Sequence, residues 1–161
     1  MAATVMIKDI VYEDFCNYKL PSMFIVFPSC TFKCEKECGQ RICQNSDLVN
    51  APSKNIGMAT IINKYINNPI TKAIVCGGLE PFDSWEELQT LISYLRVHTT
   101  DDIVIYTGYN KNELSAKMPF LKSVKNIIVK FGRYIPNQSP HYDPVLGVHL
   151  ASDNQYAERI S

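Results

Sequence analysis

The sequence predicts an α/β domain with a mostly parallel sheet. Short runs rich in β-branched and aromatic residues recur along the chain, and segments with helical periodicity separate them. Strands that alternate with helices pair in parallel, because each helix carries the chain back to the start of the next strand. The 161 residues contain no repeat and no linker, so we expect residues 1–161 to form a single domain.

The first predicted elements are a strand, a helix and a second strand. Residues 22–29 (SMFIVFPS) predict a strand that Pro28 closes. Residues 56–68 predict a helix, and residues 72–78 (KAIVCGG) predict a short buried strand that ends in two glycines. The apolar residues at helical spacing in the helix are Ile56, Ala59, Ile62 and Ile66.

The clearest helix is predicted over residues 83–99 (DSWEELQTLISYLRVHT). Asp83 or Ser84 is expected to cap its first turn, and Glu86 and Glu87 suit the positive end of the helix dipole. One face is apolar, with Leu91 at its edge. The residues of that face are Trp85, Leu88, Ile92 and Leu95.

The remaining elements continue the alternation. Residues 101–108 (DDIVIYTG) predict a strand, residues 111–118 a short helix that Pro119 ends, and residues 124–132 (VKNIIVKFG) another strand. Residues 132–147 are rich in Pro, Asn and Ser and predict an irregular loop.

Composition gives no support to several classes of partner. Lys plus Arg equals Asp plus Glu at 16 each, so no bulk charge favours nucleic acid or an anionic membrane. Lys8 and Asp9 come before any apolar block forms, which is not typical of a signal peptide, and no apolar run approaches the length of a membrane span. We therefore expect a cytoplasmic protein that binds neither nucleic acid nor membrane.

Four cysteines are crowded into one short segment: Cys30, Cys34, Cys38 and Cys43. In a reducing cytoplasm such a cluster indicates metal ligands or catalytic groups more than disulfides. A zinc ion held by all four thiolates and an iron–sulfur cluster both remain open, although the spacing lacks the paired knuckles of classical zinc sites. Cys16 and Cys76 are expected to be buried or incidental thiols.

Three motifs follow predicted strands and should therefore meet at one edge of the sheet. The cysteine segment follows residues 22–29, CGGLEP (76–81) ends the second strand, and YTGY (106–109) ends the third. Ligands of parallel α/β sheets bind at the carboxyl ends of the strands. Glycines there allow close approach of backbone to another group, and Glu80 supplies a carboxylate.

Together these motifs resemble the radical S-adenosylmethionine (SAM) enzymes, and most closely the activating proteins of anaerobic ribonucleoside-triphosphate reductase, which are similarly short. FPSCTFKCEKECGQRICQN, CGGLEPF, IYTGY and FGRYIP occur in the order expected for that family. The resemblance implies a short, partial (β/α) barrel-like fold with a mostly parallel sheet. This sequence departs from the family pattern in two places: the usual C-x3-C-x2-C becomes Cys30-x3-Cys34-x8-Cys43, and Leu79 separates Gly78 from Glu80.

The resemblance also implies ligands for the cofactors. Cys30, Cys34 and Cys43 would hold a [4Fe-4S] cluster whose open iron takes the methionine part of SAM. Cys38 offers a competing third ligand, and the neighbouring Ile42 and Asn45 favour Cys43. The residues expected to contact SAM are Ile42, Asn45, Gly77, Gly78, Glu80, Tyr106, Thr107 and Gly108.

The activity that the resemblance implies is reductive cleavage of SAM to a 5′-deoxyadenosyl radical, which generates a glycyl radical on anaerobic ribonucleotide reductase. An electron donor such as a flavodoxin-type protein would supply the electron. Two alternatives stay open: a radical SAM enzyme that acts on a small molecule, and a zinc-bound interaction module without catalysis. The shortness of the chain favours a protein substrate, because little chain remains to enclose a small one.

Overall fold

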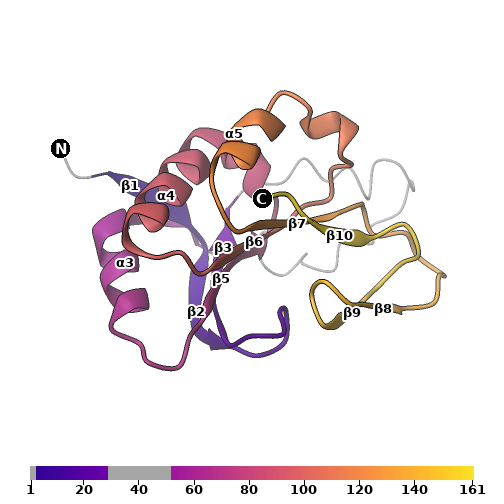
Figure 1. Cartoon of the computed structure of the whole chain (residues 1–161), viewed down its shortest axis with the longest axis horizontal. Coiled ribbons are helices and arrows are strands. Elements are labelled where there is room, and N and C mark those ends of the chain that lie inside the picture. The colour runs from indigo at the N-terminus through magenta and orange to yellow at the C-terminus, as the bar shows by residue number, and fades with distance from the viewer. Residues whose placement is uncertain (1–2, 29–51) are drawn as a thin grey trace.

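The computed structural model describes residues 3–28 and 52–161 of the chain (Figure 1). At its centre is a six-stranded mixed sheet. In spatial order the strands are β10 (Tyr156–Arg159), β7 (Ile127–Phe131), β6 (Asp102–Tyr106), β5 (Ala73–Gly78), β3 (Ser22–Phe27) and β2 (Asp9–Asp14). The inner strands β3, β5, β6 and β7 pair in parallel, and β2 and β10 pair antiparallel at the edges. The partial barrel that the resemblance implies stays a prediction.

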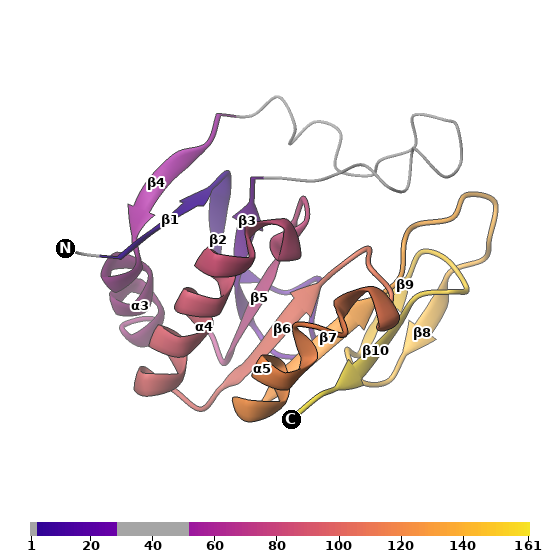
Figure 2. The same cartoon turned by 90° about the horizontal axis from the view of Figure 1, so that it is seen from above.

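Helices cover one face of this sheet (Figure 2). They are α3 (Met58–Ile66), α4 (Trp85–His98) and α5 (Met118–Ser123). A short 3-10 helix, η1 (Pro81–Ser84), joins β5 to α4, and a second, η2 (Asn112–Leu114), lies between β6 and α5. The strand–helix–strand order explains the parallel pairing, because each crossover returns the chain to the same end of the sheet.

The opposite face is covered by a hairpin. Its strands are β8 (His141–Asp143) and β9 (Val148–Leu150). Leu146 and Leu150 from this hairpin and Tyr18 from the loop after β2 pack in one buried cluster with side chains of β5, β6 and β7. The backbone N–H of Lys19 donates to the carbonyl of Leu146 at 2.7 Å, which ties the loop to the hairpin.

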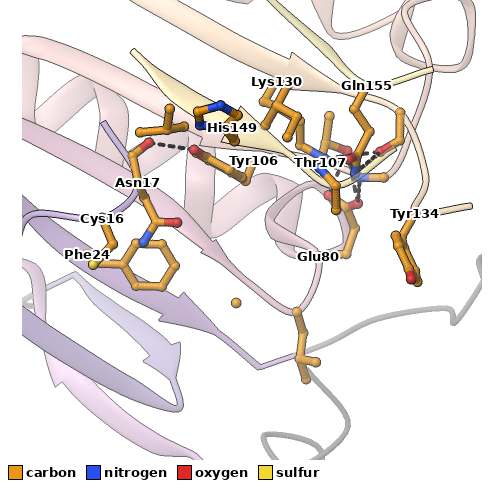
Figure 3. Close-up of a pocket in the computed structure, with 17 residues that line it drawn as sticks. Cys16, Asn17, Phe24, Glu80, Tyr106, Thr107, Lys130, Tyr134, His149 and Gln155 are labelled. Carbon is orange, nitrogen blue, oxygen red and sulfur yellow. Dashed lines mark hydrogen bonds between the residues drawn. The ribbon is translucent and has the colours of Figure 1, made fainter. Parts of the chain in front are cut away.

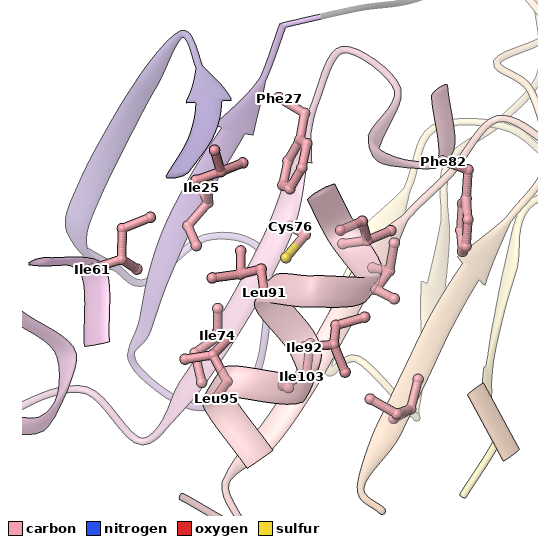
Figure 4. Close-up of a cluster of buried hydrophobic side chains, with 14 of the residues drawn as sticks. Ile25, Phe27, Ile61, Ile74, Cys76, Phe82, Leu91, Ile92, Leu95 and Ile103 are labelled. Carbon is pink, nitrogen blue, oxygen red and sulfur yellow. The ribbon is translucent and has the colours of Figure 1, made fainter. Parts of the chain in front are cut away.

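The inner strands alternate between the two faces with the period of a β-strand. Ile74, Ile103 and Ile127 pack against the helices, with the α4 side chains Leu91, Ile92 and Leu95 (Figure 4). The next residue of each strand points to the hairpin side. Those residues are Val75, Val104 and Ile128.

A two-stranded sheet lies beside the ends of β3 and α4. It is formed by β1 (Thr4–Ile7) and β4 (Lys54–Gly57), which pair antiparallel. Val5 and Ile7 are fully buried, and the backbone N–H of Met6 donates to Glu87 Oε2 at 2.6 Å. Because β4 pairs with β1, whose Val5 and Ile7 are buried, it is anchored to the core.

All of the predicted strands are confirmed, at β3, β5, β6 and β7. The helix predicted over residues 83–99 is also confirmed as α4, with Asp83 in η1. Ser84 is the N-cap residue, as one of the two predicted candidates, but its side chain makes no capping hydrogen bond.

Three boundaries differ from the prediction. The helix predicted from residue 56 begins at Met58, because Ile56 pairs with Val5 in the small sheet. The helix predicted over 111–118 is only the short η2, and Pro119 lies in the first turn of α5 instead of ending a helix. Proline is well tolerated there, since its missing N–H has no partner in a first turn.

The segment predicted as an irregular loop contains β8, and β9 follows it directly. The buried Asp143 explains the ordered turn, because its side chain accepts the N–H groups of Leu146 and Ala157 at 2.9 and 3.0 Å. Strands β1, β2, β4 and β10 were not predicted. In the described part of the chain, no helix has the length and apolar character needed to cross a membrane.

Candidate functional site

A cavity of about 320 Å³ lies on the hairpin side of the sheet, at the carboxyl ends of the inner strands (Figure 3). Its walls come from the turn after β5, the ends of β6 and β7, the loop after β2, and β9. Most of the predicted SAM-contacting residues in the described ranges line it: Gly78, Glu80, Tyr106, Thr107 and Gly108. Gly77 lies in β5 and does not line the cavity.

Glu80 is a buried carboxylate residue in the cavity wall. Its side chain is only 6% exposed and accepts hydrogen bonds from the backbone N–H of Phe82 at 3.1 Å and of Gly108 at 2.8 Å. The hydroxyl of Thr107 lies 2.9 Å from each carboxylate oxygen. This carboxylate therefore joins the end of β5 to the end of β6.

Burial raises the pKa of the Glu80 carboxyl from its ordinary value to about 7. The hydrogen bonds from Gly108, Phe82 and Thr107 oppose this shift, and the nearby Asp83 adds to it. Desolvation outweighs the donors because a buried carboxylate loses its water shell while the donors here are neutral. Glu80 can consequently change its charge near neutral pH.

Thr107 and Tyr109 continue the network from the end of β6. The Thr107 hydroxyl oxygen accepts the backbone N–H of Tyr109 at 3.0 Å. The Tyr109 hydroxyl donates to Asp83 Oδ1 at 2.5 Å, on the turn that follows β5. Two separate side-chain contacts therefore hold the turn after β6 against the turn after β5.

The two glycines of CGGLEP approach a neighbouring strand. A Cβ at Gly78 would lie 2.4 Å from Val26 Cγ1, and Gly78 has a φ of +85°. A Cβ at Gly77 would lie 2.9 Å from the Phe24 ring. The close approach that the sequence predicted is thus explained by packing against β3, and the contact of these glycines with SAM stays a prediction.

Gly108 differs from Gly77 and Gly78 in the space available for a Cβ. A Cβ there would meet Glu80 Oε1 at 3.6 Å and Arg133 Cγ at 3.7 Å, which are ordinary contact distances. The fold does not require glycine at this position. Gly108 is therefore the glycine at which an added methyl group can report the approach of a ligand.

Tyr106 and Lys130 both line the cavity (Figure 3). The Tyr106 hydroxyl donates to the carbonyl of Asn17 at 2.5 Å, and burial raises its pKa. Lys130 Nζ lies 5.7 Å from the centre of the Tyr106 ring and donates to the carbonyl of Gly132 at 3.1 Å. Tyr106 is thus held between β7 and the loop after β2.

Lys130 is a cavity residue that the sequence analysis did not single out. Its side chain is only 6% exposed although it belongs to a strand of buried apolar residues. A lysine inside the run IIVKF was the available signal, because charged residues are rarely buried without a purpose or a partner.

Gln155 is a second cavity residue that was not predicted from the sequence. Its Oε1 accepts the N–H groups of Ala151 and Ser152 at 3.0 and 3.1 Å, and its Nε2 donates to the carbonyl of Gly132 at 3.3 Å. These bonds fix the turn before β10 against the end of β7.

The predicted cluster ligands Cys30, Cys34 and Cys43, and the competing Cys38, lie outside the described residues. So do Ile42 and Asn45. Within residues 3–28 and 52–161 no group of three or more His, Cys, Asp or Glu side chains is placed to hold a metal ion. Cys76 is confirmed as a buried thiol whose pKa burial raises to about 12, and Cys16 is exposed.

The cysteine segment nevertheless follows β3, whose carboxyl end lies at the same edge of the sheet as the cavity. Phe27, the last residue of β3, pairs with Gly78, the last residue of β5. The four cysteines that follow supply soft thiolate ligands of the type that iron–sulfur clusters prefer. The residue types of this donor set therefore fit an iron–sulfur cluster.

Comparison with known families assigns the chain to the iron–sulfur cluster-binding domains. The model of a family described as a 4Fe-4S single cluster domain matches residues 22–155, and the chain belongs to that family. The match spans the central strands, the cysteine segment and the residues that line the cavity, except Cys16 and Asn17. No curated protein and no solved structure matched the chain.

Proposed function

We propose that this iron–sulfur protein is a radical SAM enzyme that activates a glycyl radical enzyme. A [4Fe-4S] cluster on Cys30, Cys34 and Cys43 would supply one electron to SAM, whose cleavage yields methionine and the 5′-deoxyadenosyl radical. The observation that carries the proposal is Glu80, a buried carboxylate on the wall of a cavity at the edge of the sheet where the cysteine segment begins.

The chain's own residues bind and orient the cosubstrate. Glu80 accepts a hydrogen bond from the amino group of SAM, and such a bond to a charged acceptor is stronger than one between neutral groups. Thr107 and the N–H of Gly108 hold that carboxylate in place at 2.9 and 2.8 Å. Tyr106 supplies an aromatic wall for the remainder of the molecule.

The size of the cavity favours a protein substrate over a small molecule. At about 320 Å³ it lies at the lower end of the roughly 300–1,000 Å³ typical of small-molecule sites. The sheet face beyond it is filled by Tyr18, Leu146 and Leu150. We therefore propose that one cosubstrate occupies the cavity and that the substrate glycine arrives on a loop of another protein, an anaerobic ribonucleotide reductase.

Anaerobic reconstitution with iron and sulfide tests the cluster. Single alanine substitutions at Cys30, Cys34 and Cys43 should abolish the cluster absorbance, and the same change at Cys38 should spare it. If Cys38→Ala loses the cluster and Cys43→Ala keeps it, Cys38 and not Cys43 is the third ligand. Stoichiometric zinc without iron would favour the interaction module.

Electron paramagnetic resonance tests the activity. The reduced protein, SAM and the cognate reductase should together give a doublet from the glycine α-hydrogen, and omission of any one should remove it. A flavodoxin-type protein should replace the chemical reductant. Cleavage of SAM without a radical on the reductase would favour the alternative, an enzyme acting on a small molecule.

A further inference from the structure

The loop after β2 forms one end of the cavity and precedes the residues that the family model matches. Cys16 and Asn17 of this loop line the cavity, whereas the match begins at residue 22. Cys16 is exposed, and so is His149, which lines the cavity from β9. The cavity wall at this end therefore comes from the N-terminal segment of the chain and can be reached from solvent.

Asp14 fixes the conformation of this loop. Its carboxylate accepts the backbone N–H groups of Cys16 and Asn17 at 3.4 and 3.3 Å, and the side-chain amide of Asn17 donates to Asp14 Oδ2 at 2.9 Å. An ionised carboxylate only accepts hydrogen bonds, so Asn17 must turn its Nδ2 toward Asp14 and its Oδ1 away from it. Figure 3 shows the side-chain oxygen of Asn17 pointing into the cavity.

Contacts with β6 hold the loop in place. The carbonyl of Asn17 accepts the hydroxyl of Tyr106 at 2.5 Å. The hydroxyl of the next residue, Tyr18, donates to Asp102 Oδ2 at 2.7 Å. Because these bonds reach both ends of β6, the loop is a preformed wall and the Asn17 side chain is oriented before any ligand binds.

This end of the cavity is aromatic. Phe24 and Tyr106 both line it. A Cβ at Gly77 would lie 2.9 Å from the Phe24 ring and 3.4 Å from Tyr106 Cβ, so Gly77 leaves the room that both side chains use against β5. Glu80 and Thr107 lie on the opposite side of the cavity in Figure 3 and make that end polar.

The chemistry of the aromatic end fits a peptide group at glycine. Asn17 Oδ1 is a neutral acceptor that receives no hydrogen bond from the residues that the structure describes, so it can accept the N–H of a ligand. A peptide group carries one such donor. Glycine has no side chain to hold its backbone away from the rings of Phe24 and Tyr106.

We propose that Asn17 binds the N–H of the glycine that the partner enzyme presents, and that Asp14 positions Asn17 for this contact. The inference rests on the proposed function, which supplies the reaction and the partner. It adds a substrate-binding residue and divides the cavity into a cosubstrate end at Glu80 and a substrate end at Asn17.

Glycyl radical formation at increasing concentrations of the cognate anaerobic ribonucleotide reductase tests this contact. With saturating SAM and reductant, Asn17→Ala should raise the KM for the reductase roughly two- to tenfold, the effect of losing one hydrogen bond. Calorimetric titration should give the same Kd for SAM as in wild type. The matched control is Asn63→Ala, which removes an exposed asparagine of α3 and should change neither value.

A double-mutant cycle tests the role of Asp14. Asp14→Ala should also raise the KM for the reductase, because it releases the Asn17 amide. The variant with both substitutions should have the KM of Asn17→Ala alone, since Asp14 acts through Asn17. Additive effects of the two substitutions would contradict the positioning role.

Two synthetic peptides test the same contact with the wild-type protein, so the inference can fail even where a variant does not fold. One peptide carries the radical-forming glycine of the reductase and the other carries N-methylglycine there, which has no N–H. Formation of 5′-deoxyadenosine should show a lower KM for the glycine peptide, and folded Asn17→Ala should reduce this difference. Equal KM values with the wild-type protein would overturn the contact.

The outcomes separate this inference from the proposed function. If folded Asn17→Ala forms the glycyl radical with an unchanged KM, the substrate contact is wrong and the radical SAM assignment stands. If the wild-type protein binds no SAM, or cleaves it without a radical on the reductase, the proposed function fails and this inference fails with it.

Discussion

The two faces of the six-stranded sheet differ in what covers them and in which side chains they bury. The helix-covered face is filled by apolar side chains of α3, α4 and alternate strand residues. The hairpin-covered face buries an apolar cluster too, but at the carboxyl ends of the strands it buries Glu80, Thr107 and Lys130 at 6, 2 and 6% exposure. Buried polar groups cost free energy unless each finds a partner, so the strand ends of the hairpin-covered face depend on their hydrogen bonds, whereas the helix-covered face is stabilised by apolar contacts.

Leu91→Ala should destabilise the protein more than Glu80→Ala or Gly108→Ala in the cavity wall. Leu91 is fully buried between α4 and the sheet. Removing its methyl groups leaves a cavity that typically costs about 2–5 kcal/mol. Denaturant unfolding measures the change, with Val97→Ala on the same helix as a control, since Val97 is 79% exposed. Similar losses in both variants would contradict the assignment of the stabilising face.

Glu80→Ala should destabilise the protein less than Leu91→Ala. The substitution leaves the N–H groups of Phe82 and Gly108 without their acceptor. Each buried unsatisfied group costs about 1–3 kcal/mol, but the variant also relieves the desolvation of the carboxylate, so we expect about 2 kcal/mol in total. Glu86→Ala, at an exposed position of α4, is the matched control for denaturant unfolding and should change stability by less than about 0.5 kcal/mol.

The stability difference between wild type and Glu80→Gln should depend on pH. Because the folded pKa is raised to about 7, the contribution of Glu80 is fully present below its unfolded pKa and is lost as pH rises through about 7. From about pH 5 to 8 the unfolding free energy of wild type should fall relative to the variant by roughly 2–3 kcal/mol. Parallel pH profiles for the two proteins would show that Glu80 titrates normally.

Gly108→Ala should have the smallest effect on stability. A methyl group fits there at ordinary contact distances, and replacing glycine can stabilise a chain by about 0.4–1 kcal/mol through the unfolded state. We expect unchanged or slightly higher stability together with weaker SAM binding, because the methyl group narrows the cavity wall next to Glu80. Gly78→Val is unsuitable for this purpose, since it would collide with Val26 whether or not SAM binds. Normal SAM affinity in Gly108→Ala would place the ligand away from this wall.

The sequence predicted the helix-covered face better than the hairpin-covered one. Ile103, Leu91 and Leu95 belong to periodic apolar patterns, and such patterns depend only on local spacing. The cavity wall was predicted in part. Glu80 and Thr107 lie at the carboxyl ends of strands, and parallel pairing brings such ends together. The bond between them and the position of Lys130 could not be predicted, because they depend on side-chain directions across three strands.

Other features that the sequence did not predict also depend on contacts between segments far apart in the chain. Strands β1 and β4 are four residues each and are stabilised by pairing between segments that lie far apart in the sequence, which no local pattern reveals. Glycine motifs are ambiguous for a similar reason. Gly77 and Gly78 predicted close approach correctly, but the partner in the structure is β3, a contact that becomes visible only when the register is known.

Hydrogen–deuterium exchange of the cluster-bearing protein with and without SAM tests most directly which face carries the function. We expect SAM to slow exchange in residues 78–82 and 106–109, around the Glu80 network, and to leave α4 unchanged. The matched comparison is within one sample, so a global change in stability would appear in both regions. Protection confined to the helices, or none at the ends of β5 and β6 under saturating SAM, would contradict the assignment of the cavity as the cosubstrate site.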